Sequence, residues 1–183
     1  MKRAFNDQSE IVPENYHILI AESTIESRLR ELGQQISNDF RGKKPILIGI
    51  LNGSFIFLAD LIRNLDIDVE VDFLRISSYG DDRESSGHIK ILKPLSADIN
   101  GRHVIVVEDI VDSGLSVQFL EKMLSAFNPV QLKFVTLLNK PSKNIVDVNI
   151  DYVGFEIEDK FVVGYGLDDA QLKRNLRSIY FIE

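Results

Sequence analysis

The stretch Val106-Val107-Glu108-Asp109-Ile110-Val111-Asp112-Ser113-Gly114-Leu115-Ser116 decides the fold. It begins inside a short apolar run, 103–107, which predicts a buried strand, and it continues into carboxylates and a turn of small residues. Beyond the turn, apolar residues recur at helical spacing: Val117, Leu120, Leu124 and Phe127. We therefore predict a strand, an acidic turn and an amphipathic helix in direct succession.

The same alternation of apolar strands and amphipathic helices runs along the chain. Ser23-Thr24-Ile25-Glu26 has the form of a capping box, which predicts a helix beginning at Ser23. The other expected elements are helices 23–40 and 55–65 and strands 45–51, 69–76, 134–138, 152–157, 161–165 and 178–182. This order predicts an α/β fold with a mostly parallel twisted sheet flanked by helices. Ligands of such sheets bind beyond the carboxyl ends of the strands, where the acidic turn lies.

Composition narrows the class of protein. A chain of 183 residues, 44% hydrophobic and 27% charged, suffices for one sizeable core, so we expect a single domain. It has no cysteine, which excludes disulfides and thiol chemistry, and it has neither a secretory leader pattern nor an apolar run that could span a bilayer. These features predict a cytoplasmic location. The net charge of -7 argues against nucleic acids and membrane surfaces as partners.

Each part of the acidic turn has a use in binding a phosphorylated sugar. The small residues Ser113, Gly114 and Ser116 let a phosphate approach the amides at the helix start, where the helix dipole attracts anions. Glu108 and Asp109 suit ribose hydroxyls or a hydrated magnesium ion. Asp112 stands apart and could accept a proton from a ring nitrogen or stabilise positive charge on the sugar. The alternative is an ordinary capping turn at a solvated sheet edge.

The full pattern resembles the phosphoribosyl pyrophosphate signature of type I phosphoribosyltransferases. Residues 107–114, Val-Glu-Asp-Ile-Val-Asp-Ser-Gly, are similar to the hypoxanthine-guanine branch of that family. The likeness covers nearly the whole chain and includes the stretches 49–54, 77–80, 137–141, 153–157 and 161–168. It implies one phosphoribosyltransferase domain, with a core at about 40–165 and a small hood formed by about 1–20 and 166–183.

The resemblance implies a purine-salvage transferase that uses magnesium. In the family a purine base, hypoxanthine or guanine, displaces pyrophosphate from 5-phosphoribosyl 1-pyrophosphate with inversion at the anomeric carbon, and IMP or GMP is formed. By resemblance, Asp112 handles the proton of purine N7, and Glu108 and Asp109 contact the ribose hydroxyls and the metal. The residues that would cradle the 5-phosphate are Asp112, Ser113, Gly114, Leu115 and Ser116.

Further roles implied by the resemblance concern the purine. Lys140 would donate to the exocyclic oxygen at purine position 6. An ammonium can only donate, and adenine carries an amino group there, so adenine should be rejected. Phe161 would stack on the base, Val162 would offer backbone groups to its edge, and Asp168 would lie with them and help hold a second metal. Without the resemblance, a lysine after a strand is usually solvated and an aromatic residue at a strand start usually belongs to the core.

The resemblance also implies a pyrophosphate loop. Leu51, Asn52 and Gly53 would form it, and the family holds a non-proline cis peptide bond at this place. Arg174 would contact the same group. Some relatives carry basic residues where Asn52 and Ser77 stand, so more of the binding of pyrophosphate would fall on magnesium and on backbone amides.

A lid and an assembly complete the expectations. The loop 78–87 resembles the catalytic lid of the family, in which Ser78 and Tyr79 close over the reaction centre and keep water from the activated sugar. An ordinary polar surface loop would have the same composition. Because the family commonly forms dimers or tetramers, we expect a homodimer or a homotetramer.

Other functions compete with this one. A xanthine-preferring transferase stays open, because xanthine differs only at purine position 2. A non-catalytic, nucleotide-sensing regulator on the same fold would want a basic face or an added helix-turn-helix, and this acidic chain has neither. A dehydrogenase would need a Gly-x-Gly-x-x-Gly pattern after a strand, which the chain lacks. His17, His88 and His103 are too dispersed for a metallohydrolase.

Overall fold

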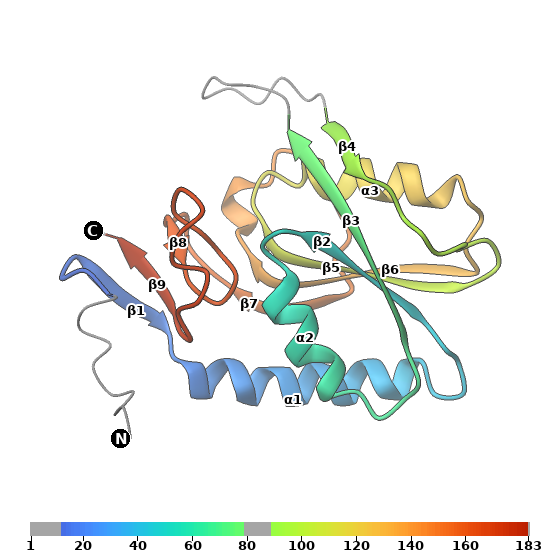
Figure 1. Ribbon diagram of the computed structural model, residues 1–183, viewed down its shortest axis with the longest axis horizontal. Coiled ribbons are helices and arrows are strands. Elements are labelled where there is room, and N and C mark those ends of the chain that lie inside the picture. Colours follow the sequence, from blue (N-terminus) through green and yellow to red (C-terminus); the bar gives the residue numbers. More distant parts are fainter. Residues whose placement is uncertain (1–11, 79–88, 183) are drawn as a thin grey trace, which may run out of the picture.

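Two sheets and three helices organise the part of the chain that the computed structural model describes, residues 12–78 and 89–182 (Figure 1). The larger sheet has the strand order β4-β3-β2-β5-β6-β7, and the small sheet has the order β1-β9-β8. In chain order the elements are β1 (Tyr16–Ile20), α1 (Glu22–Asp39), β2 (Ile46–Leu51), α2 (Phe55–Arg63), β3 (Glu70–Ser78), β4 (Ile89–Lys93), β5 (His103–Val111), α3 (Leu115–Ser125), β6 (Gln131–Asn139), a 3-10 turn (Pro141–Lys143), β7 (Tyr152–Glu156), β8 (Val162–Val163) and β9 (Ile179–Ile182).

The main sheet is buried on both faces. β3, β2, β5, β6 and β7 run parallel, and β4 pairs antiparallel with β3 at one edge. α1 and α2 cover one face and α3 covers the other (Figure 1), so the apolar runs of the central strands, such as Ile46, Leu47 and Ile48, are fully buried. The predicted α/β fold, a mostly parallel sheet flanked by helices, is confirmed.

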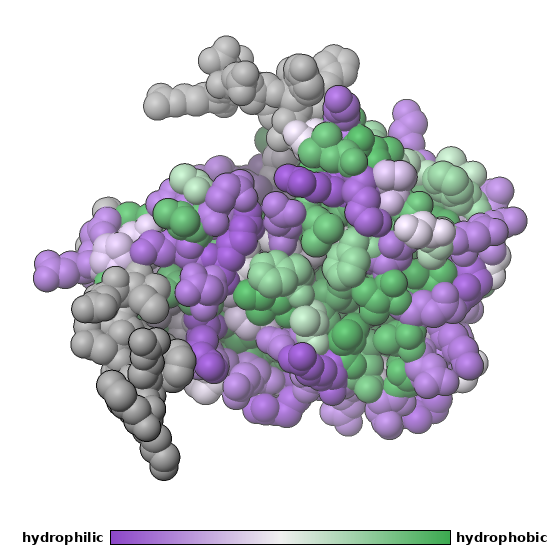
Figure 2. Space-filling model, viewed as in Figure 1, coloured by the Kyte–Doolittle hydropathy of each residue, from purple (hydrophilic) through white to green (hydrophobic). Residues whose placement is uncertain are grey.

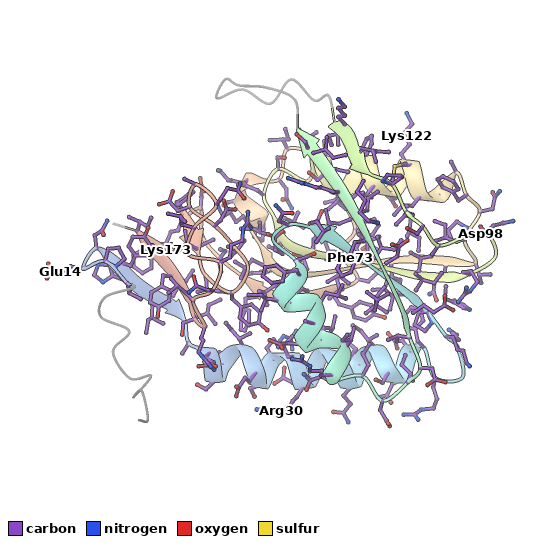
Figure 3. The ribbon with its side chains drawn as sticks, in the orientation of Figure 1. Glu14, Arg30, Phe73, Asp98, Lys122 and Lys173 are labelled. Atoms are coloured by element: carbon purple, nitrogen blue, oxygen red, sulfur yellow. The ribbon has the colours of Figure 1, made fainter. Side chains whose placement is uncertain are left out.

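Two glycines allow close packing, one between α1 and α2 and the other between α2 and the main sheet. A Cβ on Gly33 of α1 would overlap the backbone carbonyl of Asn64, just after α2. Gly49 of β2 lies so close to Leu58 of α2 and to Phe73 of β3 that a Cβ there would crowd both side chains. Phe73, labelled in Figure 3, packs with the core on the face of the sheet that α1 and α2 cover. Side chains at these two positions would push the helices apart and away from the sheet.

The small sheet joins segments from the two ends of the chain. β9 lies between β1 and β8 and is antiparallel to both, with Tyr16 opposite Ile182 and Val163 opposite Tyr180. Figure 1 shows this sheet beside the main sheet, at the end where α1 begins. The small hood implied by the resemblance is therefore present, and it includes β8, which precedes residue 166.

The predicted capping box at the start of α1 is wrong. The helix begins at Glu22, and Ala21 before it has extended backbone and makes no side-chain cap. The amide of Glu22 instead donates to Ser178 Oγ at 3.1 Å, and Arg177 pairs with the Glu22 carboxylate at 2.6 Å. The cap is supplied from the far end of the chain, so a pattern of neighbouring residues does not report it.

Other elements differ from the prediction at their ends. β5 continues past the predicted end at Val107 to Val111, so Glu108 and Asp109 lie within the strand. α3 ends at Ser125, and Phe127, predicted on its apolar face, lies beyond it and is 53% exposed. β1 and β4 are edge strands with few buried residues, and for that reason they lack the apolar run by which the central strands are recognised.

Apolar side chains also reach the surface. Figure 2 shows a hydrophobic area near the middle of the face that carries α2 and β3, bordered by hydrophilic residues. Phe55 of α2 is 44% exposed, and Val71 of β3 is 41% exposed. Exposed apolar areas are common places of contact between proteins. Within the described ranges, no helix is long and apolar enough to cross a membrane.

Candidate active site

β5 brings the three predicted carboxylates to one edge of the main sheet. It lies between β2 and β6, so its carboxyl end faces the segments that follow both neighbours. Glu108 is only 6% exposed, whereas the side chain of Asp112, beyond the strand end, is 45% exposed. The acidic stretch therefore has a buried part and an open part.

The loop after β2 packs on the buried part. The peptide bond between Leu51 and Asn52 is cis, as the resemblance implied. A Cβ on the next residue, Gly53, would overlap the carboxylate of Asp109. Glycine leaves the room that Asp109 occupies, so the predicted pyrophosphate loop and a predicted ribose-binding carboxylate share one wall of the site.

The segment after β8 closes over the same loop. Gly166 has a φ of +101°, and a Cβ there would overlap the carbonyl of Gly53. Arg174 Nη1 donates to the carbonyl of Gly166 at 2.7 Å, and Arg174 Nη2 pairs with Asp168 Oδ1 at 2.6 Å. Arg174 and Asp168 are thereby brought within electrostatic range of Asp109. We call the set Leu51–Gly53, Asp109, Gly166, Asp168 and Arg174 the Asp109 side of the site.

Burial perturbs the carboxylates at the end of β5. Desolvation raises the pKa of Glu108 well above its usual range, and the charge of Asp109 adds to the effect. Desolvation also raises the pKa of Asp109 to about 6, against the opposing effect of backbone hydrogen bonds and of the Arg174 guanidinium. A carboxylate that is costly to ionise has its charged form stabilised by a nearby cation or by hydroxyl donors. A phosphorylated sugar with its metal would bring both.

The turn after β5 opens the first turn of α3 to a ligand. Gly114, with a φ of +82°, precedes the helix, which has no side-chain cap. Ser113 Oγ lies 3.4 Å from the amide of Leu115, and Ser116 is exposed. Amides in the first turn of a helix have no acceptor within the helix, so they can bind the oxygens of a phosphate. The 5-phosphate cradle at Asp112–Ser116 stays a prediction, at the start of a helix that has no side-chain cap.

In the open part, Asp112 belongs to a network of two lysines and two aspartates. The ammonium of Lys140 lies 3.6 Å from Asp112 Oδ2 and 3.4 Å from Asp159 Oδ1. The ammonium of Lys143 lies 3.5 Å from Asp112 Oδ1 and 3.1 Å from Asp159 Oδ1. The Lys140 side chain is 6% exposed, and the other three are roughly half-exposed. We call these four residues the Asp112 side of the site.

Comparison with known proteins identifies the family. A family model described as the phosphoribosyl transferase domain matches residues 18–170. The chain belongs to this family. A hypoxanthine-guanine phosphoribosyltransferase of Bacillus subtilis is 43% identical to this phosphoribosyltransferase over 159 residues, which cover 87% of this chain and 88% of that protein.

Solved structures of phosphoribosyltransferases share the fold. A hypoxanthine-guanine phosphoribosyltransferase of Bacillus anthracis is 46% identical, with a TM-score of 0.88 over 91% of this chain and 98% of that chain. A hypoxanthine phosphoribosyltransferase of Staphylococcus aureus is 36% identical, with a TM-score of 0.91 over 98% and 97% of the two chains. The main sheet and the hood are those of a type I phosphoribosyltransferase, as the sequence resemblance implied.

This phosphoribosyltransferase places Lys140, one of the predicted purine residues, at the open part of the acidic stretch. Lys140 directly follows β6, and its amide donates to the carbonyl of Val111 at 2.9 Å. Phe161, just before β8, is 57% exposed, while Val162 is buried. An aromatic residue at a strand start usually belongs to the core, but Phe161 does not, and its ring is accessible for stacking.

The structure describes no ready-made metal cage: no group of three or more acidic or histidine side chains within 12–78 and 89–182 is placed to hold an ion. Glu108, Asp109 and Asp168, the predicted ligands, do not form such a group. Asp168 Oδ1 pairs with Arg174, and Oδ2 accepts a bond from the Gln171 amide at 2.8 Å. Carboxylate oxygens still suit magnesium, which commonly takes one or two of them and completes its shell with water and substrate phosphates.

Most of the predicted lid lies outside the described residues. Ser78 is the last residue of β3, and Tyr79 and the rest of the loop to Gly87 fall in the stretch that the structure does not describe. Because β3 runs parallel to β2, its carboxyl end lies at the same edge of the sheet as the acidic stretch. The lid therefore stays a prediction, attached at the correct edge.

A hollow elsewhere in the molecule does not mark the site. A cavity of about 550 Å³ is lined by residues 41–44 and 65–68, which precede β2 and β3. It therefore lies at the amino ends of the strands, opposite the acidic stretch. Ligands of parallel sheets bind at the carboxyl ends, and none of the predicted site residues line this cavity.

Three residues of the site escaped the sequence prediction. Gly166 lies inside a stretch that resembles the family, and its close approach to Gly53 depends on chain folding. Lys143 and Asp159 lie in polar segments, the first in the 3-10 turn after β6 and the second between β7 and β8. Charged residues in such segments are usually solvated, so their type carried no signal.

Proposed function

We propose that the chain is a purine-salvage enzyme that transfers the 5-phosphoribosyl group of 5-phosphoribosyl 1-pyrophosphate to hypoxanthine or guanine, which gives IMP or GMP and pyrophosphate. The single observation that carries the proposal is the placement of Asp112 between the open first turn of α3 and the buried ammonium of Lys140. The relatives named above as hypoxanthine-guanine and hypoxanthine phosphoribosyltransferases support the choice of base.

In the proposed reaction, residues 112–116 hold the 5-phosphate through the amides at the start of α3. Glu108 and Asp109 accept hydrogen bonds from the ribose hydroxyls, for which their buried oxygens are suited. A purine ring nitrogen bonds to the anomeric carbon while the bond from that carbon to the pyrophosphate oxygen breaks. The purine releases its N7 proton to the carboxylate of Asp112, which acts as a general base.

Base selection rests on the open side. Lys140 donates to the oxygen at purine position 6, and a buried ammonium facing the amino group of adenine would lose its acceptor. Phe161 stacks on the ring and the backbone of Val162 meets its edge. The charge of Lys140 also explains why hypoxanthine and guanine are both accepted, since they share the 6-oxo group.

The Asp109 side faces the leaving group. Leu51, Asn52 and Gly53 offer backbone groups to pyrophosphate, and Arg174 offers a guanidinium. Glu108, Asp109 and Asp168 would hold magnesium together with oxygens of the donor. When bound, magnesium would neutralise negative charge on the pyrophosphate as it departs.

We also propose a cytoplasmic enzyme that associates as a homodimer or homotetramer. The exposed apolar side chains of Phe55 and Val71 support self-association. Light scattering coupled to gel filtration measures the mass of the particle directly. A monomer at micromolar concentration would contradict this part of the proposal and leave the catalytic part intact.

A spectrophotometric assay tests the reaction. The purified protein is given 5-phosphoribosyl 1-pyrophosphate and magnesium with hypoxanthine, guanine, xanthine or adenine in turn. We expect nucleotide from hypoxanthine and guanine and none from adenine. Product from xanthine alone would favour the xanthine-preferring alternative, product from adenine alone would remove the role of Lys140, and no product with any base would favour the nucleotide-sensing regulator.

A further inference from the structure

Lys143 and Asp159 form the half of the four-residue network that the proposed reaction does not use. Each lysine contacts both aspartates: Lys140 reaches Asp112 Oδ2 and Asp159 Oδ1, and Lys143 reaches Asp112 Oδ1 and Asp159 Oδ1. The pairing is therefore redundant. Removal of either ammonium leaves a cation between the two carboxylates.

Lys140 cannot keep its partners while it binds a base. In the structure the Lys140 ammonium is paired with the carboxylates of Asp112 and Asp159, whereas the proposed function requires it at the 6-oxo group of the purine. If Lys140 turned away from two aspartates with no other cation beside them, their charges would repel each other and draw it back. Lys143 already lies between them, and its longest contact is 3.5 Å.

Asp159 links this network to the stacking residue. It lies between β7 and β8, two positions before Phe161. The segment is fixed at its start, where the amide of Ile157 donates to the carbonyl of Asn139 at 2.9 Å. At Asp159 it is fixed by the two lysines, which follow β6. The ion pairs thus tie Asp159, two residues before Phe161, to the two lysines that also contact Asp112.

We propose that Lys143 and Asp159 are positioning residues of the purine subsite: their ion pair holds the Phe161 segment against the Asp112 turn and releases Lys140 to the base. This inference rests on the proposed function. Pairing with Asp159 raises the pKa of Lys143, and pairing with Lys143 lowers the pKa of Asp159, so both stay charged at neutral pH. Because three of the four side chains are about half-exposed, the pairs are weak enough to exchange partners on binding.

Steady-state kinetics of Lys143→Gln, Lys143→Arg, Asp159→Asn and the double variant Lys143→Gln/Asp159→Asn test the proposal. We expect Lys143→Gln and Asp159→Asn each to raise the KM for hypoxanthine about fivefold to tenfold, with kcat and the KM for the ribosyl donor changed less than about twofold. Lys143→Arg should restore the KM for hypoxanthine. The double variant should be no worse than the worse single variant, because both changes break one pair.

Lys44→Gln is the matched control. Lys44 also pairs with an aspartate, Asp68, at 3.5 Å, and it precedes β2 at the opposite edge of the sheet. The Lys44→Gln substitution removes the same charge as Lys143→Gln and should leave every kinetic constant within about twofold of the wild-type value. Thermal melting of each variant checks folding.

The outcomes separate the two proposals. An active wild type whose base KM does not change in Lys143→Gln and Asp159→Asn overturns the positioning role alone. A fall in kcat as large as the rise in KM also overturns the positioning role alone. Additive effects of the two substitutions in the double variant do the same. A wild type that makes no nucleotide from any base overturns the proposed function and, with it, the positioning role.

Discussion

The two sides of the site are built by different forces. On the Asp109 side, backbone and side chain meet at contact distance: the Asp109 carboxylate fills the place of a Gly53 side chain, and Gly166 rests on the Gly53 carbonyl. On the Asp112 side, four charged side chains hold one another across 3.1 to 3.6 Å, and three of them are about half-exposed. Close packing gives a fixed shape, and exposed ion pairs give an adjustable one.

This difference matches what each side is proposed to bind. Pyrophosphate and its metal are the same for every base, so a rigid wall suits them. The base enters and leaves in each turnover, and it can be hypoxanthine or guanine. The ion pairs on the Asp112 side must therefore be able to break when a base binds and to form again when it leaves. Four substitutions test the comparison.

Asp112→Asn should have the largest effect. It removes the proton acceptor from the open side without changing the size of the side chain, so we expect kcat to fall about a thousandfold and the affinity for the ribosyl donor to change little. Single-turnover kinetics and direct titration of the donor measure the two quantities separately. An unchanged kcat would take Asp112 out of the chemistry.

Gly53→Ala should come next. The added methyl would overlap the Asp109 carboxylate, and the rigid side has no room to yield, so we expect kcat/KM for the donor to fall about a hundredfold. Gly101→Ala is the control, because a Cβ there would meet nothing within 4 Å; the φ of Gly101, +66°, strains an alanine, so this variant shows what a loss of stability without a clash in the site does to activity. If Gly53→Ala kept full activity while its fold was intact, the Asp109 side would not be rigid.

Lys140→Gln should have an intermediate effect, confined to the base. A neutral amide can offer a hydrogen bond to the 6-oxo group without the charge, so we expect kcat/KM for hypoxanthine to fall about thirtyfold. An amide can also accept a hydrogen bond from an amino group, so discrimination against adenine should weaken. If kcat/KM for the ribosyl donor, measured at saturating base, fell as much as kcat/KM for hypoxanthine, the role of Lys140 would not be confined to the Asp112 side.

Asp109→Asn should change stability in the opposite direction to activity. Because the folded pKa of Asp109, about 6, lies above its ordinary value of 3.8, the folded protein binds the proton more tightly than the unfolded chain does. The resulting stability is fully present below about pH 4 and is lost as the pH rises to about 6, a loss on the order of 3 kcal/mol.

The neutral asparagine avoids this loss. We therefore expect Asp109→Asn to raise the free energy of unfolding of the ligand-free protein at pH 7.5 and to match the wild type at pH 4, as measured by urea denaturation at both values. Enzyme activity at pH 7.5 should fall in the same variant. A variant that is less stable than the wild type at pH 7.5 would show that Asp109 is not held in a costly, buried position.

Local stretches of the sequence predicted the site where its parts follow one another in the chain. The succession of β5, acidic turn and α3 places Glu108, Asp109, Asp112 and residues 113–116 together by covalent connection. Lys140 was placed in the site by the family resemblance, and the structure shows it directly after β6, whose carboxyl end shares the edge with β5. The family resemblance added the cis peptide bond at Leu51–Asn52, which the structure contains.

The sequence prediction failed where the partner comes from far along the chain. The capping box at Ser23 was a sound local pattern, but Ser178 reaches the Glu22 amide from β9's end of the hood and sets the start of α1. Phe127 continued the apolar spacing of α3, yet the helix stops before it. Lys143 and Asp159 gave no local sign, because an ion pair between two loops depends on how the loops are brought together.

The amino-acid sequence by itself determined the order of the central strands and the helices, and the position of the acidic stretch at a strand end, because each follows from the pattern of neighbouring residues. Tertiary structure alone decided that Gly53 and Gly166 must be glycines, that Arg174 and Asp168 face Asp109, and that Asp112 shares two lysines with Asp159. Contacts of this kind depend on distances between segments that are remote in sequence, and local preferences carry no information about such distances.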